Sequence, residues 1–161
     1  FTNVDKYGLI LLNNMLGAGM ASRMFQNIRE KYGFAYSVYS TLDFYTDFGM
    51  FYSYIATDSK HIDQSKTLIH QEIEKLRNGD LSEQEVIDSK LQMKGGLLIS
   101  LESNSRRADR LLRQWLNYGE FYSIDEQLNR FDALSLQNLT DLAVKYLNTE
   151  TLSTMVIRSK T

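Results

Sequence analysis

The sequence predicts an α+β fold, in which an antiparallel sheet of few strands is covered by a layer of helices. Most of the chain carries apolar residues at helical spacing, whereas two neighbouring segments, 34–42 and 48–56, are rich in Tyr, Val and Thr. The chain contains no proline, which suits long helices and short turns. Its 161 residues are 43% hydrophobic and 24% charged. This length and balance are typical of one globular domain, so we expect residues 1–161 to form a single domain.

Glycines mark the ends of the first two predicted helices. Apolar residues within 9–16 repeat at helical spacing and stop at Gly17 and Gly19. Glycine can end a helix because it tolerates left-handed dihedral angles. Residues 24–29 return to helical spacing, and Gly33 closes this second, short helix. The prediction is two helices separated by a glycine turn.

The two β-prone segments form a predicted hairpin. Residues 43–47 lie between the strands 34–42 and 48–56 and include two aspartates. Aspartate favours turns because its side chain bonds to nearby backbone amides. After the second strand, Asp58 can accept hydrogen bonds from the free amides at a helix start. An apolar stripe over 62–76 then predicts a third helix, which ends before an Asn-Gly pair.

A capping box begins the fourth predicted helix. The hydroxyl of Ser82 can accept a hydrogen bond from the amide of Glu85, and the carboxylate of Glu85 can reach back to Ser82. The apolar stripe continues over 87–101 and includes the pair Gly95 and Gly96. Because these glycines lie within the stripe, we expect a bend or a close approach of another helix there, rather than a helix end.

Shorter helices and a strand complete the predicted fold. Apolar spacing predicts helices over 108–115, 124–131 and 136–147, and residues 152–158 are expected to form a last strand. Such a sheet has few strands for the helices it must carry. We therefore expect this sequence to be a fragment of a longer chain, whose first strand lies upstream of Phe1.

Composition disfavours several classes of function. The formal net charge is -2 and the basic residues are scattered, so nucleic acid is not an expected partner. The sequence has no cysteine, which rules out disulfides and cysteine-ligated zinc and leaves cytoplasm and periplasm equally open. No apolar run reaches the roughly 20 residues that a membrane-spanning helix needs.

The two histidines, His61 and His70, do not predict a metal site. On a straight helix their separation corresponds to about 900° of rotation, which places the rings on opposite faces. We expect both at the surface. Gly17-x-Gly19 lacks the further residues of a phosphate-binding loop, so a turn is preferred there. No Ser-His-Asp set stands out either.

Aromatic residues crowd the predicted hairpin. Such rings can line a peptide-binding surface or fill the face of a sheet, and we expect core packing. The residues are Tyr45, Phe48, Phe51, Tyr52 and Tyr54.

The most informative stretch covers residues 16–40, LGAGMASRMFQNIREKYGFAYSVYS. It combines a glycine turn, a short helix and a strand. The stretch resembles the signature of the carboxy-terminal, non-catalytic half-module of the pitrilysin and insulysin family, zinc metallopeptidases that include the mitochondrial processing peptidase. The order of elements along nearly the whole chain is also similar. There are two departures from the family. The strand that normally begins the family module is absent here, and Ala18 and Ala21 stand where the family has its second glycine and first serine. Both alanines are small enough to keep the turn.

The resemblance gives Arg29 and Tyr36 a role in substrate binding. Family members carry an arginine in the last turn of this helix and a tyrosine seven residues later, and both reach toward the zinc site of the other module. A guanidinium and a phenol can donate hydrogen bonds to a carbonyl oxygen that gains negative charge. The alternative is an Arg29 paired with Glu30 or another acid and a Tyr36 packed on the sheet. Ser22 and Arg23, which also match the family, are assigned a structural role.

The resemblance therefore implies the non-catalytic half of a zinc-dependent peptidase, which forms one wall of a peptide-binding chamber. It implies that zinc, water and general base come from a partner domain or subunit with a His-x-x-Glu-His helix. This chain would bind no cofactor and hydrolyse nothing by itself. The two halves could share one polypeptide or form a homo- or hetero-dimer. The alternative is a structural or protein-interaction subunit of the same fold, as in respiratory-complex core proteins. A ligand-binding domain outside the family is the third hypothesis.

Overall fold

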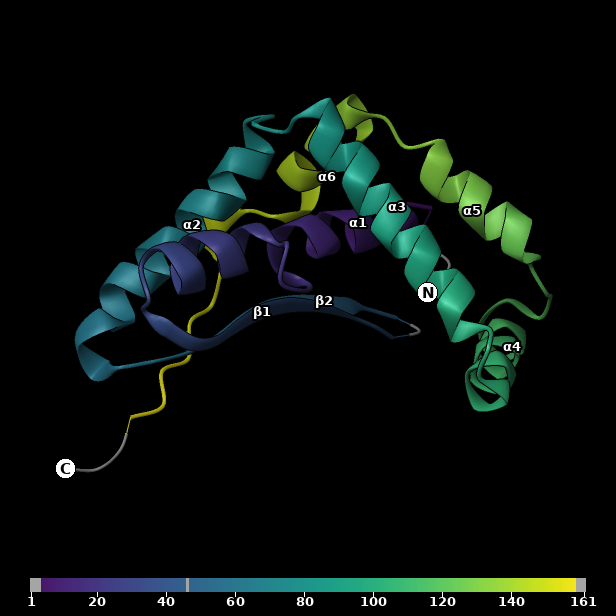
Figure 1. The fold of residues 1–161 in the computed structure, drawn as a ribbon, viewed down its shortest axis with the longest axis horizontal. Coiled ribbons are helices and arrows are strands. Elements are labelled where there is room, and N and C mark those ends of the chain that lie inside the picture. The colour runs from purple at the N-terminus through teal and green to yellow at the C-terminus, as the bar shows by residue number, and fades with distance from the viewer. Residues whose placement is uncertain (1–3, 46, 159–161) are drawn as a thin grey trace.

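The computed structural model describes residues 4–45 and 47–158 and confirms the α+β fold. Its two strands pair antiparallel, and Figure 1 shows the helices on one side of this sheet, except for α4, which lies beyond the hairpin turn and below the sheet. The elements are α1 Lys6–Gly17, the π-helix η1 Phe25–Lys31, β1 Ala35–Phe44, β2 Gly49–Thr57, η2 Ser59–His61, α2 Ile62–Arg77, α3 Glu83–Ser100, α4 Asn104–Tyr118, α5 Ile124–Asp132, α6 Leu136–Tyr146 and η3 Thr149–Thr151.

Helix α1 is the centre of the core. Leu11 and Leu16 are fully buried, and the helix packs against β1, α3 and α6. Gly17 ends α1 directly over β1, where an added Cβ atom would lie 2.4 Å from the backbone nitrogen of Ser40. Gly19, with a φ of 114°, supplies the left-handed turn that follows. The glycine turn is therefore confirmed, but Gly17 serves close packing rather than an unusual dihedral angle.

One predicted helix cap is wrong, and the predicted capping box forms only in part. Asp58 makes no side-chain cap, because a 3₁₀ turn (η2) precedes α2 and the Asp58 carbonyl accepts from the His61 amide at 2.9 Å. Ser82 does accept from the Glu85 amide, at 3.1 Å. The Glu85 carboxylate does not return to Ser82, because it binds Arg23 instead.

No other helix packs closely against the paired glycines of α3 within the described residues. Helix α3 continues through Gly95 and Gly96, and an added Cβ atom on either would meet no other atom within 4 Å. The expectation of a close helix approach at this point is therefore wrong. Both glycines lie where a larger side chain has room.

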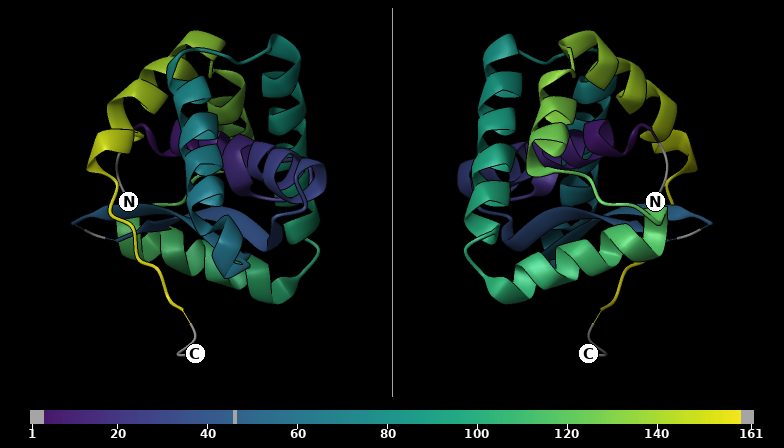
Figure 2. Two further views of the ribbon diagram at one scale, coloured as in Figure 1. Left: turned by 90° about the vertical axis from the view of Figure 1, so that its left-hand side faces the viewer. Right: turned by 90° about the vertical axis from the view of Figure 1, so that its right-hand side faces the viewer.

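The predicted last strand is also wrong. Residues 152–158 follow an extended path but pair with neither strand of the described sheet. Their apolar side chains at Met155 and Ile157 are exposed, and Figures 1 and 2 show the segment leaving the helices and passing beyond the sheet. A strand requires a neighbour for its backbone hydrogen bonds, which apolar composition alone does not guarantee.

Candidate functional site

Tyr36 occupies a β-bulge at the start of β1. Ala35 lies opposite Thr57 and Ser37 lies opposite Ala56, so Tyr36 has no partner across the ladder. In a regular strand Tyr36 would share the core-facing side of Val38, because successive side chains alternate. The extra residue changes this alternation. Ala35 faces the core instead, and the Tyr36 side chain is 88% exposed.

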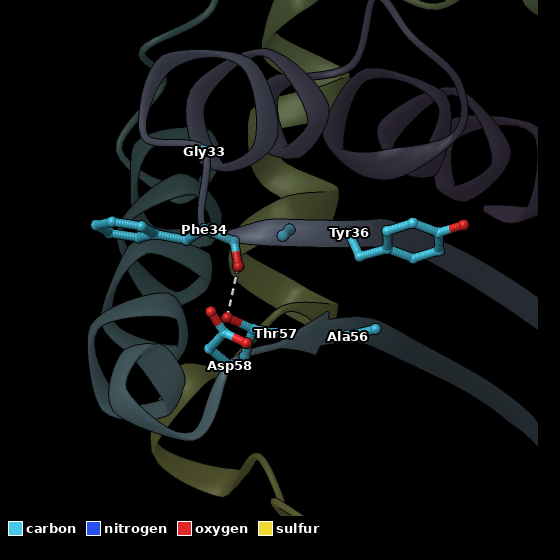
Figure 3. A pocket seen from close by; sticks show the side chains of 7 residues that line it. Gly33, Phe34, Tyr36, Ala56, Thr57 and Asp58 are labelled. Carbon is cyan, nitrogen blue, oxygen red and sulfur yellow. Dashed lines mark hydrogen bonds between the residues drawn. The ribbon is translucent and has the colours of Figure 1, made fainter.

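A shallow hollow of about 470 Å³ lies beside Tyr36 (Figure 3). It is bounded by the ends of both strands and by Asp58. The Thr57 hydroxyl donates to the Phe34 carbonyl at 2.5 Å and holds the strand ends together. Figure 3 shows the rings of Phe34 and Tyr36 pointing in opposite directions along the sheet. The Tyr36 hydroxyl bonds to no residue within 4–45 or 47–158, so it is available to a ligand.

Arg29 lies in the π-helix η1 and is exposed. Its guanidinium carbon lies 4.7 Å from the ring centroid of Phe25, one helical turn earlier. This is a cation–π contact, which leaves the N–H donors at the edge of the guanidinium free. The Arg29 side chain makes no ion pair with Glu30 or with any other acid of the described segments. The two alternatives, a paired Arg29 and a packed Tyr36, are therefore not what the structure contains.

Ser22 and Arg23 have the structural role that the sequence predicted. The Ser22 hydroxyl donates to the Gly19 carbonyl at 2.6 Å, which closes the glycine turn. The Nε and one Nη of the Arg23 guanidinium donate to the two carboxylate oxygens of Glu85, at 2.6 Å each. The helix that carries Arg29 is thereby fixed to the first turn of α3.

The outward side of the hairpin is a surface that we call the tyrosine face. The register places its members in opposite pairs, and the rings of Tyr39 and Tyr54 stack with centroids 5.0 Å apart. The face comprises Tyr39, Thr41 and Asp43 on β1 and Met50, Tyr52 and Tyr54 on β2.

Core packing was therefore the wrong expectation for most of the hairpin aromatics. Only Phe51 packs against the core. Tyr52 and Tyr54 are exposed on the tyrosine face, and Tyr45 and Phe48 are exposed at the turn, where their rings stack at 4.5 Å. The reason is that helices cover one face of the hairpin only. The alternation of Tyr39, Thr41 and Asp43 in the sequence is the signal that could have identified the outward face.

The histidines lie apart from these residues and are half-buried rather than exposed. His61 stacks on Phe34 with ring centroids 4.3 Å apart, and His70 lies within α2. Residues 4–45 and 47–158 contain no group of three or more side chains that could hold a metal ion, so the described residues do not fit a zinc site. No helix in these ranges is long and apolar enough to cross a bilayer.

Known proteins are similar to this chain in sequence or in fold. Residues 2–93 match the family model of the peptidase M16 inactive domain. The uncharacterized zinc protease YmxG of Bacillus subtilis (strain 168) is 39% identical over 137 residues, which are 85% of this chain and 34% of that protein. The chain spans about a third of the length of the curated relatives it matches.

Two solved structures share the fold at low sequence identity. The peptidase M16 inactive domain from Pseudomonas fluorescens has a TM-score of 0.82 and 21% identity, over 91% of this chain and 35% of that one. A chain of complex III2 from Candida albicans has a TM-score of 0.79 and 18% identity, over 90% and 37% of the two chains. At these identities the likeness concerns the fold alone.

Proposed function

Because the chain belongs to the family of peptidase M16 inactive domains, we propose that it forms one wall of the peptide-binding chamber of a zinc-dependent peptidase. In this proposal Arg29 and Tyr36 contact the substrate. The metal, the water and the general base belong to a catalytic His-x-x-Glu-His half. That half is either on the same polypeptide or on a second subunit, and this chain alone hydrolyses nothing.

The observation that carries the proposal is the pair of free hydrogen-bond donors at Arg29 and Tyr36. Neither side chain has a hydrogen-bond partner within the described residues. Both stand on irregular backbone, a π-helix and a β-bulge, and such irregularities frequently occur at functional sites. Apart from the cation–π contact of Arg29 with Phe25, neither side chain has an evident structural task among the described residues. They are suited to bind a peptide carbonyl from solvent.

The proposed chemistry is stabilisation of developing charge. When water attacks a peptide carbonyl, negative charge develops on its oxygen, and donors placed in advance stabilise that charge more than they stabilise the neutral substrate. Arg29 would supply a charged donor and Tyr36 a neutral one. The ion pair between Arg23 and Glu85 supports this arrangement, because it fixes the helix that carries Arg29.

The test is peptidase activity of the assembly, by which we mean this chain combined with its matching His-x-x-Glu-His half. Cleavage of a pool of quenched fluorescent peptides is measured for the parent chain and for Arg29→Ala and Tyr36→Phe. We expect zinc-dependent cleavage that each substitution lowers by about tenfold or more. Arg106→Ala and Tyr32→Phe change exposed residues of the same types and serve as controls.

The second candidate is a structural or protein-interaction subunit without a role in proteolysis. The fold similarity to a chain of complex III2 favours it. It predicts that this chain associates with a partner but that no mixture cleaves peptides. If Arg29→Ala and Tyr36→Phe both left cleavage unchanged, the role of this chain would likewise be structural.

A further inference from the structure

Asp43 is an unpartnered carboxylate on the tyrosine face. It is half-buried, and it makes no ion pair or hydrogen bond with the residues of 4–45 and 47–158. The register places Met50 directly opposite and Tyr52 diagonally beside it. Partial burial raises the pKa of Tyr52, and the negative charge of Asp43 raises it further. An isolated negative charge on a largely uncharged surface favours a positively charged ligand.

The tyrosines around Asp43 offer two further interactions. The hydroxyls of Tyr39, Tyr52 and Tyr54 have no hydrogen-bond partner among the described residues, so they can bind the backbone of a peptide. Their rings can bind a cation through the π-face. Tyrosine also provides a large contact area with little loss of side-chain entropy, which is why binding surfaces use it widely.

We propose that the tyrosine face binds an extended peptide segment and selects a Lys or Arg side chain, which lies between Asp43 and the ring of Tyr52. This inference rests on the proposed function, since it extends the same chamber wall. Among the described members of the face, Asp43 is the sole charged residue. An acidic peptide would be repelled there, and an apolar one would cover the carboxylate without pairing it.

The position of this subsite along the peptide follows from strand geometry. Asp43 lies seven residues after Tyr36 in β1, and a strand rises about 3.3 Å per residue. Because the bulge shortens the path slightly, the two side chains stand roughly 20 Å apart along the sheet, the length of about six or seven extended residues. The basic side chain would therefore lie that far from the carbonyl bound at Tyr36. A preference so distant from the cleaved bond distinguishes this face from the residues around Tyr36.

The experiment measures peptide binding by an assembly that cannot cleave. The glutamate of the His-x-x-Glu-His helix is changed to glutamine. Fluorescence anisotropy then follows labelled peptides in which one Lys is the single charged side chain, placed at each position in turn. Peptides with norleucine in place of Lys provide the uncharged reference. We expect the Lys peptide to bind about three- to tenfold more tightly than its norleucine counterpart, with the optimum about six or seven residues from the cleaved bond.

Asp43→Asn tests the assigned carboxylate and Asp47→Asn is its matched control. Asp47 is an exposed residue of the neighbouring turn, so its removal changes the net charge equally. We expect Asp43→Asn to abolish the preference for Lys and Asp47→Asn to preserve it. An equal preference in Asp43→Asn, or no dependence on Lys position, would overturn the inference. A Lys preference that depends on Asp43 would uphold it even if Arg29→Ala and Tyr36→Phe left cleavage unchanged, which would refute only the proposed catalytic contacts.

Discussion

Arg23 and Glu85 join the start of η1 to the first turn of α3 through two parallel hydrogen bonds, each 2.6 Å long. Both side chains are largely shielded from water. Arg23→Ala would leave the Glu85 carboxylate without its partner in a partly desolvated place. We expect the free energy of unfolding to fall by about 2 kcal/mol, measured by urea titration.

The exposed pair of Arg113 and Asp109 provides the control for this loss. It lies within α4 at 2.8 Å, with both side chains open to solvent. Exposed pairs contribute little, so Arg113→Ala should change the free energy of unfolding by less than about 0.5 kcal/mol through this interaction. Equal effects of Arg23→Ala and Arg113→Ala would show that the shielded pair of Arg23 and Glu85 does not fix η1.

A methyl group at Gly17 should destabilise the fold. Its added Cβ atom would lie 2.4 Å from both the backbone nitrogen and the hydroxyl oxygen of Ser40. Because backbone must move to accept it, we expect Gly17→Ala to cost about 1–3 kcal/mol. Gly95→Ala, in the open middle of α3, should instead stabilise by about 0.5–1 kcal/mol. Thermal unfolding measures the stability of both variants. A Gly17→Ala variant as stable as the parent would contradict the close packing of Gly17 on Ser40.

Substitutions at Tyr36 and Val38 should differ in their effect on stability, because only Val38 is part of the core. Tyr36 projects into solvent, so Tyr36→Ala is expected to change the free energy of unfolding by less than about 0.5 kcal/mol. Val38 is buried on the other side of the same strand, and Val38→Ala should cost about 1–3 kcal/mol. Chemical denaturation compares the two. A large loss in Tyr36→Ala would mean that the ring packs on the protein.

The carboxylate of Asp5 should contribute to the loss of stability at acid pH. Its carboxylate accepts from Lys145 at 2.7 Å and from Tyr146 at 2.8 Å, and these hydrogen bonds lower its pKa. A group whose pKa is lower in the folded protein stabilises it above the unfolded pKa, about 3.9, and this contribution is lost as the pH falls through the folded pKa. In acid titrations of stability, Asp5→Asn and Lys145→Ala should both show a smaller decrease below about pH 4. An unchanged pH profile in both would rule out this contribution.

Local patterns were sufficient to predict the helices and the hairpin, but not the interactions among them. Ser82 caps α3 as its sequence context indicates. The sequence also predicts that the carboxylate of Glu85 joins this cap, whereas it binds Arg23, which is distant in the chain. The strand predicted over 152–158 failed for a related reason, since pairing requires a neighbour that composition does not reveal.

The candidate site depends on irregular backbone that no periodic pattern predicts. Regular alternation would place Tyr36 on the side of Val38, and the β-bulge reverses it. A regular α-helix was expected where Arg29 lies in a π-helix. The family resemblance nevertheless proposes both residues, because a motif records which residues occur together even where the local geometry is unusual. The sequence pattern places Asp43 in the turn, whereas β1 extends to Phe44, because composition does not indicate where a strand ends.

The measurement that tests the central claim most directly is the turnover number of the assembly with Tyr36→Phe. This substitution removes one hydroxyl from an exposed ring and leaves the fold intact. We predict that kcat falls about tenfold or more while KM changes little, because the hydroxyl acts in the transition state rather than in ground-state binding. A kcat equal to that of the parent assembly and of the Tyr32→Phe control would contradict the proposed contact of Tyr36 with the reacting carbonyl.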